Sequence, residues 1–383
     1  MGMRITDISL VDFRNYGSFS LAGLDSLTIF TGRNGVGKTN LLEAIQLVTS
    51  CESFRHPQIA QLIRDGAPAA RVAIEATDGD RRLSTALTLE PGKKRYAVNG
   101  KAKGATDVRG TLPAVAFTPD DLQLAKKSSS AKRAAIDDLG AQLSRNYHVV
   151  LGDYEKTLRY KNRLLKEEAS GDLIAAINET LVTCGSQLFC YRTALFSRML
   201  PLLQRAYGDI SDGNEQFSAT YLPSWDHLDG AEMGDGSTPG PMLVSPLDVR
   251  ENGAPDRGQV RDILSERLER FSDEERRRGR SLVGPHNDKI AFFLSSRDAA
   301  SFASQGQQRS IVLAWKLAEV ELVRQTLGTN PVLLLDDVMS ELDSTRRDTL
   351  VHLASDEIQT FITATDLDGF NPALLQRARI VEL

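Results

Sequence analysis

The chain has few cysteines, no basic excess and no long uninterrupted apolar run, and each shortage removes a class of protein. Only three cysteines occur among 383 residues, at Cys51, Cys184 and Cys190. This spacing fits neither a disulfide framework nor a zinc site, so a reducing compartment, the cytoplasm, is expected. No apolar run approaches the roughly 18 residues of a membrane span, so no membrane partner is expected.

A net charge of −5, from 46 basic and 51 acidic residues, argues at first sight against a nucleic-acid partner. The charge is distributed unevenly, however. Residues 81–133 contain 12 basic and 4 acidic residues, whereas residues 201–257 contain 3 and 10. Because a locally basic segment lies in an acidic chain, the total charge does not exclude DNA.

The length is enough for two or three domains, and 41% hydrophobic with 25% charged residues is typical of globular proteins. Periodicity predicts strands at 4–13, 27–30, 72–76, 83–89, 95–98, 114–117, 289–294, 332–335 and 360–362, and helices at 38–48, 305–327 and 346–353. Residues 131–207 have helical spacing throughout. We therefore expect one α/β domain from residues 1–130 and 280–383, interrupted by a mainly helical lobe, 131–279, in which 223–257 form a loop-rich insertion.

The segment GRNGVGKT at residues 32–39 matches the phosphate-loop pattern G-x-x-x-x-G-K-[ST] and lies between a predicted strand and a predicted helix. Its glycines allow backbone N–H groups to surround a phosphate, and Lys38 adds a positive charge. The Thr39 hydroxyl suits Mg²⁺. ATP and Mg²⁺ are the expected cofactors, and the predicted binding residues are Gly32, Arg33, Asn34, Gly35, Val36, Gly37, Lys38, Thr39 and Asn40.

The apolar strand at 332–335 ends in two carboxylates, Asp336 and Asp337. In a nucleotide site, Asp336 would hold the metal with Thr39, and Asp337 would polarise the attacking water. Lys38 and Asp336 are 298 positions apart, so a large insertion must interrupt the sheet between them.

A third element, Ser304-Gln305-Gly306-Gln307-Gln308-Arg309, precedes the helical segment 310–327, and its Ser304 lies 32 residues before Asp336. It resembles the signature motif of ABC-type ATPases, in which a serine at a helix N-terminus meets the γ-phosphate. Ser304, Gly306 and Gln307 are expected to bind nucleotide, and Lys38, Ser304, Gln307 and Asp337 are the predicted catalytic residues. Residues 340–343 resemble the D-loop. Thr365 stands where many ABC ATPases carry a histidine, so either Thr363 or Thr365 could sense the γ-phosphate.

Several segments together resemble the RecF family of bacterial recombination mediators: 12–16 (DFRNY), 32–40, 117–122 (FTPDDL), 284–286 (GPH), 302–309 and 333–343. Asn287 and Lys289 depart from the family pattern. The resemblance implies an ABC/SMC-type ATPase head and an ATP-dependent homodimer in which one copy's phosphate loop faces the other's signature. It further implies clamping of double-stranded and gapped DNA, weak DNA-dependent ATP hydrolysis, and loading of RecA with RecO and RecR in repair, replication restart and the SOS response.

Candidate DNA contacts flank a hairpin predicted at Asn99-Gly100 and follow the strand at 114–117: Lys93, Lys94, Arg95, Lys101, Lys103, Lys126 and Lys127, with Tyr96 interleaved and Lys132 and Arg133 nearby. A solvated hairpin face is an equal alternative. Arg55 and Arg64 follow the phosphate-loop helix, where related heads place a basic residue near nucleotide or DNA. His286 is either a turn residue or a catalytic one, and both tryptophans, Trp225 and Trp315, are expected in the core.

Two other classes are compatible with a phosphate loop. A transporter ATPase subunit normally has its signature roughly a hundred residues after the phosphate loop, whereas Lys38 and Ser304 are 266 positions apart. An SMC head would carry a coiled-coil arm, and the middle region lacks the long run of heptads that such an arm needs.

Overall fold

The computed structural model describes residues 2–126, 129–225, 255–341, 346–347, 350, 357–368 and 370–383. Two compact units are present, one formed by Met1–Asp121 with Glu319–Leu383 and the other by Leu122–Ala318. The predicted boundary near residue 280 therefore lies too early. The reason is that β10 (Lys289–Leu294) pairs with β9 (Phe217–Leu222), and so belongs to the second unit.

The first unit contains a five-stranded, all-parallel sheet in the order β14-β3-β13-β12-β8. Its strands are β3 (Leu27–Thr31), β8 (Ala114–Phe117), β12 (Val332–Asp336), β13 (Thr360–Ala364) and β14 (Arg379–Glu382). The residues of β3, β12 and β13 are all buried, which explains their continuous apolar pattern. The carboxyl ends of β3, β13 and β12 lie side by side as a result.

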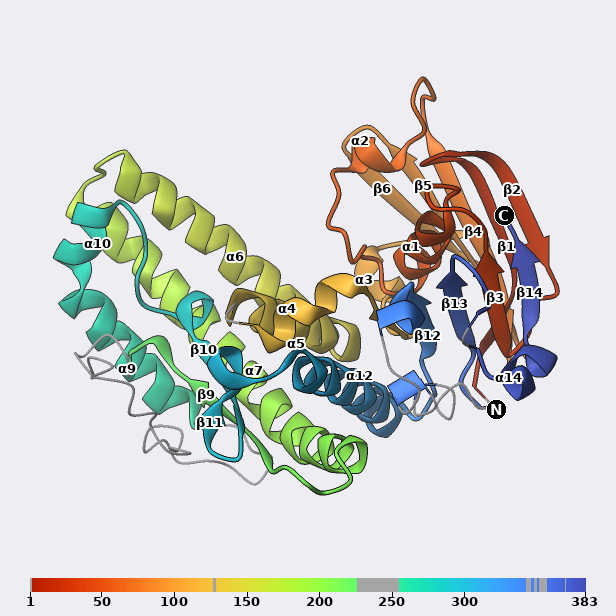
Figure 1. Cartoon of the computed structure of the whole chain (residues 1–383). Coiled ribbons are helices and arrows are strands. Elements are labelled where there is room, and N and C mark those ends of the chain that lie inside the picture. The colour runs from red at the N-terminus through yellow and green to blue at the C-terminus, as the bar shows by residue number, and fades with distance from the viewer. Residues whose placement is uncertain are drawn as a thin grey trace. The chain divides into compact units, whose positions relative to one another are not determined.

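The first unit also contains a six-stranded antiparallel sheet, in the order β2-β1-β4-β5-β6-β7. Figure 1 labels all of its strands except β7. The strands are β1 (Arg4–Phe13), β2 (Tyr16–Ala22), β4 (Ala70–Thr77), β5 (Arg82–Glu90), β6 (Lys93–Val98) and β7 (Lys101–Lys103). Helix α1 (Lys38–Thr49) packs against strands of both sheets, and its buried leucines share one core with them. Short helices are α2 (Ile59–Leu62), α3 (Ala105–Val108), η1 (Pro119–Asp121), η3 (Val338–Glu341) and α14 (Pro372–Arg377).

The second unit is mainly helical and has a small sheet of its own, β11-β10-β9, with β11 at Arg297–Asp298. Its helices are α4 (Leu122–Ala125), α5 (Ser129–Leu143), α6 (Arg145–Lys166), α7 (Gly171–Ile210), α9 (Arg257–Arg270), α10 (Ser272–Arg278), η2 (Pro285–Asn287) and α11 (Ala299–Phe302). Helix α12 (Gln305–Leu327) begins here and continues into the first unit. The helical segment predicted at 131–207 is confirmed, and it consists of α5, α6 and α7. The insertion predicted at 223–257 lies largely outside the described residues.

The Gly284-Pro285-His286 turn is part of a buried polar network in the second unit. Tyr154 Oη and His286 Nδ1 lie 2.6 Å apart, and Asn287 donates to the Leu282 carbonyl at 2.8 Å. Burial lowers the pKa of His286 to about 4, so the ring is neutral at pH 7. These contacts favour the structural role of His286. Trp225 and Trp315 are buried, as predicted.

Helix α7 is long and apolar enough to cross a membrane, judged by length and composition alone. The sequence does not reveal this as an apolar run, because charged residues interrupt the helix. The core helix of a globular unit passes the same test, and α7 packs against α5, α6, α9 and β9. It also carries the buried Arg192, which pairs with Asp137 at 2.8 Å. The packing and the ion pair therefore indicate that α7 is the central helix of its unit.

Candidate nucleotide site

The phosphate loop connects the end of β3 to the first residue of α1. Gly35 and Gly37 have φ values of 84° and 120°, in the left-handed region that favours glycine. Lys38 is only 7% exposed, and its Nζ donates to the carbonyls of Gly32 at 2.6 Å and Arg33 at 3.1 Å. The lysine charge therefore lies over the loop at the start of a twelve-residue helix, where an anion is stabilised.

The turn between β1 and β2 packs directly against this loop. Asn15 Nδ2 donates to the Val36 carbonyl at 2.8 Å, and the Tyr16 hydroxyl donates to the Gly37 carbonyl at 3.1 Å. A Cβ atom on Gly37 would lie 2.7 Å from Asn15 Nδ2 and 2.8 Å from the Tyr16 hydroxyl oxygen. The DFRNY segment thus shapes the phosphate loop, a role that the sequence analysis did not assign. Its spacing from the loop offered no signal beyond the family resemblance.

A buried carboxylate, Glu43 on α1, connects the same turn to the helix. Arg14 donates to both Glu43 oxygens, at 2.9 and 2.8 Å, and the Ser53 hydroxyl donates at 2.6 Å. Glu43 is fully buried. Arg55 donates to Asn40 Oδ1 at 2.8 Å, beside the phosphate loop, whereas Arg64 pairs with Asp12 at 2.9 Å. Of the two basic candidates, the structure therefore places Arg55 next to predicted nucleotide-binding residues.

Replacing Arg14 by alanine should destabilise the first unit. The change leaves Glu43 buried with the Ser53 hydroxyl and a more distant Arg55, 3.8 Å away. An uncompensated buried charge costs about 3–5 kcal/mol, and we expect a loss near the lower end because two partners remain. Urea unfolding of Arg14→Ala against Arg81→Ala, whose partner Asp78 is in a turn, measures the effect. Equal stability of the two variants would contradict the assignment of Arg14 as the main charged partner of the buried Glu43.

The carboxyl ends of three neighbouring strands bring the predicted metal ligands together. Thr39 Oγ1 donates to Asp336 Oδ1 at 2.9 Å, although the two residues are 297 positions apart. Thr363, on the intervening strand β13, donates to the same oxygen at 2.8 Å. Burial raises the pKa of Asp336, while the two hydroxyls act in the opposite direction. The structure therefore brings the sequence-predicted pair Thr39 and Asp336 within hydrogen-bond distance.

This donor set fits ATP with Mg²⁺. Magnesium in nucleotide sites takes one or two protein oxygens and completes its shell with phosphates and water. A threonine hydroxyl beside one carboxylate meets that requirement. Among the described residues, no cluster of three or more His, Cys, Asp or Glu side chains that could hold a metal occurs. The phosphate loop would supply the anion-binding part of such a nucleotide site.

Asp337 follows at the end of β12 with a φ of 53°, and its backbone N–H donates to Thr363 Oγ1 at 2.9 Å. Thr365 is exposed just beyond β13, with its hydroxyl 3.3 Å from Asp366 Oδ2. Of the two candidate phosphate sensors, Thr363 is therefore engaged with the acidic pair. The predicted D-loop, 340–343, is only partly described: residues 340 and 341 belong to η3, and 342–343 lie outside the described residues.

The predicted signature begins α12 in the second unit. The Ser304 hydroxyl accepts from the Gln307 N–H at 3.2 Å, and Gln307 Oε1 accepts from the Ser304 N–H at 2.7 Å, a reciprocal capping box. Gln307 also donates to Glu215, which accepts a hydrogen bond from Tyr207 at 2.7 Å. Phe302, two residues before Ser304, is 68% exposed. The N-terminus of α12 is therefore exposed at Ser304, and the exposed ring of Phe302 lies two residues before it.

The basic candidates separate into exposed and buried side chains. Exposed residues are Lys93, Lys94, Arg95, Lys101, Lys103 and Lys126, while Lys127 lies outside the described residues. Tyr96 is 4% exposed and donates to the carbonyls of Leu47 and Cys51, so it is a core residue and cannot stack on bases. Lys132 is also buried, bonded to the Ile290 carbonyl at 3.1 Å and 4.2 Å from the Phe292 ring centroid. For Lys132, burial contradicts both sequence interpretations, a DNA contact and a solvated face.

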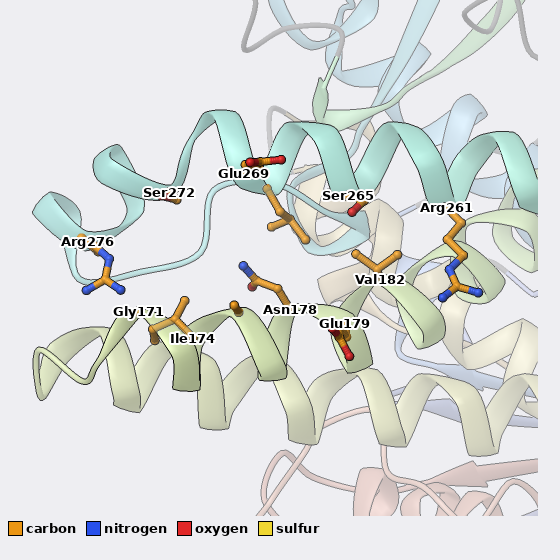
Figure 2. Close-up of a pocket in the computed structure, with 12 residues that line it drawn as sticks. Gly171, Ile174, Asn178, Glu179, Val182, Arg261, Ser265, Glu269, Ser272 and Arg276 are labelled. Atoms are coloured by element: carbon orange, nitrogen blue, oxygen red, sulfur yellow. The ribbon is translucent and has the colours of Figure 1, made fainter.

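A separate cavity of about 420 Å³ lies in the helical unit between α7 and α9 (Figure 2). Its apolar lining includes Ile174 and Val182 from α7 and Leu268 from α9, and Figure 2 shows Arg261 and Arg276 toward opposite ends. None of the sequence-predicted site residues lines it. The cavity is therefore distinct from the nucleotide site.

Together, the five-stranded parallel sheet, the phosphate loop and the acid-tipped strand define a P-loop ATPase head of the ABC/SMC type. Residues 4–379 match the family model for the RecF/RecN/SMC N-terminal domain. The fold is similar to that of the Pyrococcus furiosus Smc head, with a TM-score of 0.52 at 17% identity, covering 99% of this chain and 93% of that one.

Within this class, the similarity to RecF is closer. The chain is 35% identical to the DNA replication and repair protein RecF of Symbiobacterium thermophilum, over 96% of this chain and 92% of the relative. It is 32% identical to RecF of Halalkalibacterium halodurans, over 100% and 98%. The solved structure of the recombination mediator protein RecF bound to ATP in the RecFOR pathway matches with a TM-score of 0.82 at 27% identity, over 97% and 94%. The chain belongs to the RecF family.

Proposed function

We propose that this protein is an ATP-dependent DNA-binding recombination mediator that hydrolyses ATP slowly and uses ATP as a switch. The contact between Thr39 and Asp336 carries the proposal, because it joins the phosphate loop to the acidic strand across 297 positions of sequence. The RecF relatives support the DNA repair role. A transporter subunit has no comparable support.

In the proposed site, Lys38 neutralises charge on the β- and γ-phosphates, and residues 32–37 surround the phosphates with backbone N–H groups. Thr39 and Asp336 would hold Mg²⁺, which neutralises phosphate charge when bound. Asp337 would polarise the attacking water. Slow turnover is expected, because a switch requires a long-lived ATP-bound state.

The remaining nucleotide contacts would come from a second copy of the chain. In this proposal, Ser304, Gly306 and Gln307 of one copy meet the γ-phosphate held by the other copy's phosphate loop. The exposure of Ser304 and of the neighbouring Phe302 supports this, since an exposed aromatic ring beside a helix N-terminus suits an interface. ATP would therefore drive homodimerisation.

The proposed DNA-contacting surface is the basic hairpin, defined as Lys93, Lys94, Arg95, Lys101 and Lys103 on β6 and β7. All five side chains are exposed, and β7 is the edge strand of its sheet. Dimerisation would double this basic surface, and the two copies would then clamp duplex or gapped DNA. Loading of RecA with RecO and RecR, at gaps in cytoplasmic DNA, completes the proposal by analogy with the RecFOR pathway of the relatives.

The test of the whole proposal is binding to gapped, duplex and single-stranded DNA with ATP, ADP or no nucleotide. We expect the tightest binding with ATP and on DNA that contains duplex. Equal affinity in all three nucleotide conditions, or no binding in any of them, would contradict an ATP-driven clamp.

Reversing two charges on the basic hairpin should weaken DNA binding without changing ATP binding. Each lost phosphate contact lowers the salt dependence of log K by about 0.9, so Lys101→Glu with Lys103→Glu should reduce the slope by roughly 2 per copy of the chain. Fluorescence anisotropy from 50 to 200 mM salt measures it. Lys156→Glu, an exposed lysine on α6, is the control. An unchanged slope in the double variant would place the DNA elsewhere.

A further inference from the structure

The hydroxyl of Thr363 joins the two acidic residues of the candidate site. Thr363 lies at the end of β13, and its side chain is fully buried. Its Oγ1 donates to Asp336 Oδ1 at 2.8 Å and accepts from the Asp337 N–H at 2.9 Å. The same hydroxyl therefore donates a hydrogen bond to the carboxylate of Asp336 and accepts one from the backbone of Asp337.

These two bonds fix different features of the site. The bond to Asp336 orients the carboxylate that also accepts from Thr39, so two hydroxyls approach the same oxygen from two strands. The bond from Asp337 holds a non-glycine residue at a φ of 53°, where an L residue is strained unless its surroundings stabilise it. This second bond therefore holds the backbone at the point where the chain leaves β12.

We propose that Thr363 is a positioning residue for the metal–nucleotide site, acting through Asp336 and Asp337 rather than as a sensor of the γ-phosphate. This inference rests on the proposed function and deepens it. A group that orients a metal ligand typically contributes 10- to 100-fold to metal affinity. The role of phosphate sensor is left to Thr365, which is exposed beyond the strand.

The strand itself provides a matched control. Thr360 is also fully buried on β13, but its hydroxyl donates to the Ile358 carbonyl at 3.1 Å and does not contact either acid. Thr363→Val and Thr360→Val remove the same atom from the same strand. Thr363→Ser keeps the hydroxyl and should restore the site.

The test is direct binding of Mn²⁺, as a probe of the Mg²⁺ site, measured by electron paramagnetic resonance with ADP present. We expect Thr363→Val to bind Mn²⁺ about 10-fold more weakly, while Thr363→Ser and Thr360→Val stay within about twofold of the unmodified protein. If Thr363→Val does not fold, as judged by thermal unfolding, Thr363→Ala replaces it.

Unchanged Mn²⁺ affinity in a folded Thr363→Val or Thr363→Ala would overturn the inference, and so would an equal loss in Thr360→Val or a failure of Thr363→Ser to restore binding. If the unmodified protein showed no nucleotide-dependent Mn²⁺ binding, the proposed function itself would fail. The two failures are therefore distinguishable.

Discussion

Lys38→Met is expected to remove ATP binding almost completely while leaving the fold intact. In the structure, the ammonium group lies over the phosphate loop, held by the carbonyls of Gly32 and Arg33. Methionine has a similar length and keeps the packing of the stem but loses the charge. A hydrogen bond to a charged group contributes about 1.5–3 kcal/mol, and the lysine is expected to make more than one to phosphate, so a loss of about 100-fold or more follows.

Titration with a fluorescent ATP analogue measures this loss, and thermal unfolding shows that the variant is folded. Lys156→Met, an exposed lysine on α6, is the control and should bind ATP like the unmodified protein. Binding of ATP by Lys38→Met within about threefold of the control would contradict the assignment of residues 32–39 as the phosphate loop.

Ser304→Arg is expected to separate dimerisation from ATP binding. Ser304 lies in the second unit and caps α12, whereas the phosphate loop lies in the first. Loss of the cap costs about 1 kcal/mol, which leaves the protein folded. A long side chain at the proposed interface would prevent a second copy from approaching the nucleotide. We therefore expect ATP affinity within about twofold and a dimer weakened about 100-fold or more.

Sedimentation equilibrium with and without ATP measures the dimer, and Thr183→Arg, which adds the same side chain to an exposed site on α7, is the control. The control should dimerise normally. A Ser304→Arg variant that still dimerises with ATP would contradict the arrangement in which each copy completes the other's site.

The elements closest to the nucleotide site were predictable because their chemistry is local in sequence. The strand–loop–helix at β3 and α1, and the apolar strand ending in Asp336, each carry a complete pattern within a few residues. The hairpin turn at Asn99-Gly100 was also predictable, because Asn-Gly is a strong hairpin signal. In the structure both residues have the positive φ values that such a turn requires, 49° and 75°. Strands β3 and β12 could be assigned to a common sheet from the sequence once a large insertion between them was expected.

The remaining features depend on contacts between distant parts of the chain. Tyr96 and Lys132 belong to a basic stretch, yet both are buried. The two-residue period of a strand and the 3.6-residue period of a helix decide which side chains face the core. The β1–β2 turn meets the phosphate loop only through tertiary packing. Likewise, β10 was assigned to the wrong unit because its partner, β9, is more than 60 residues away.

The mass of the unmodified protein in solution, measured by sedimentation velocity with Mg²⁺-ATP, Mg²⁺-ADP and no nucleotide, tests the central claim most directly. The account predicts a particle of twice 42.0 kDa with ATP and a single chain of 42.0 kDa in the other two conditions. A single chain under saturating ATP, or a dimer in all three conditions, would contradict an ATP-driven switch.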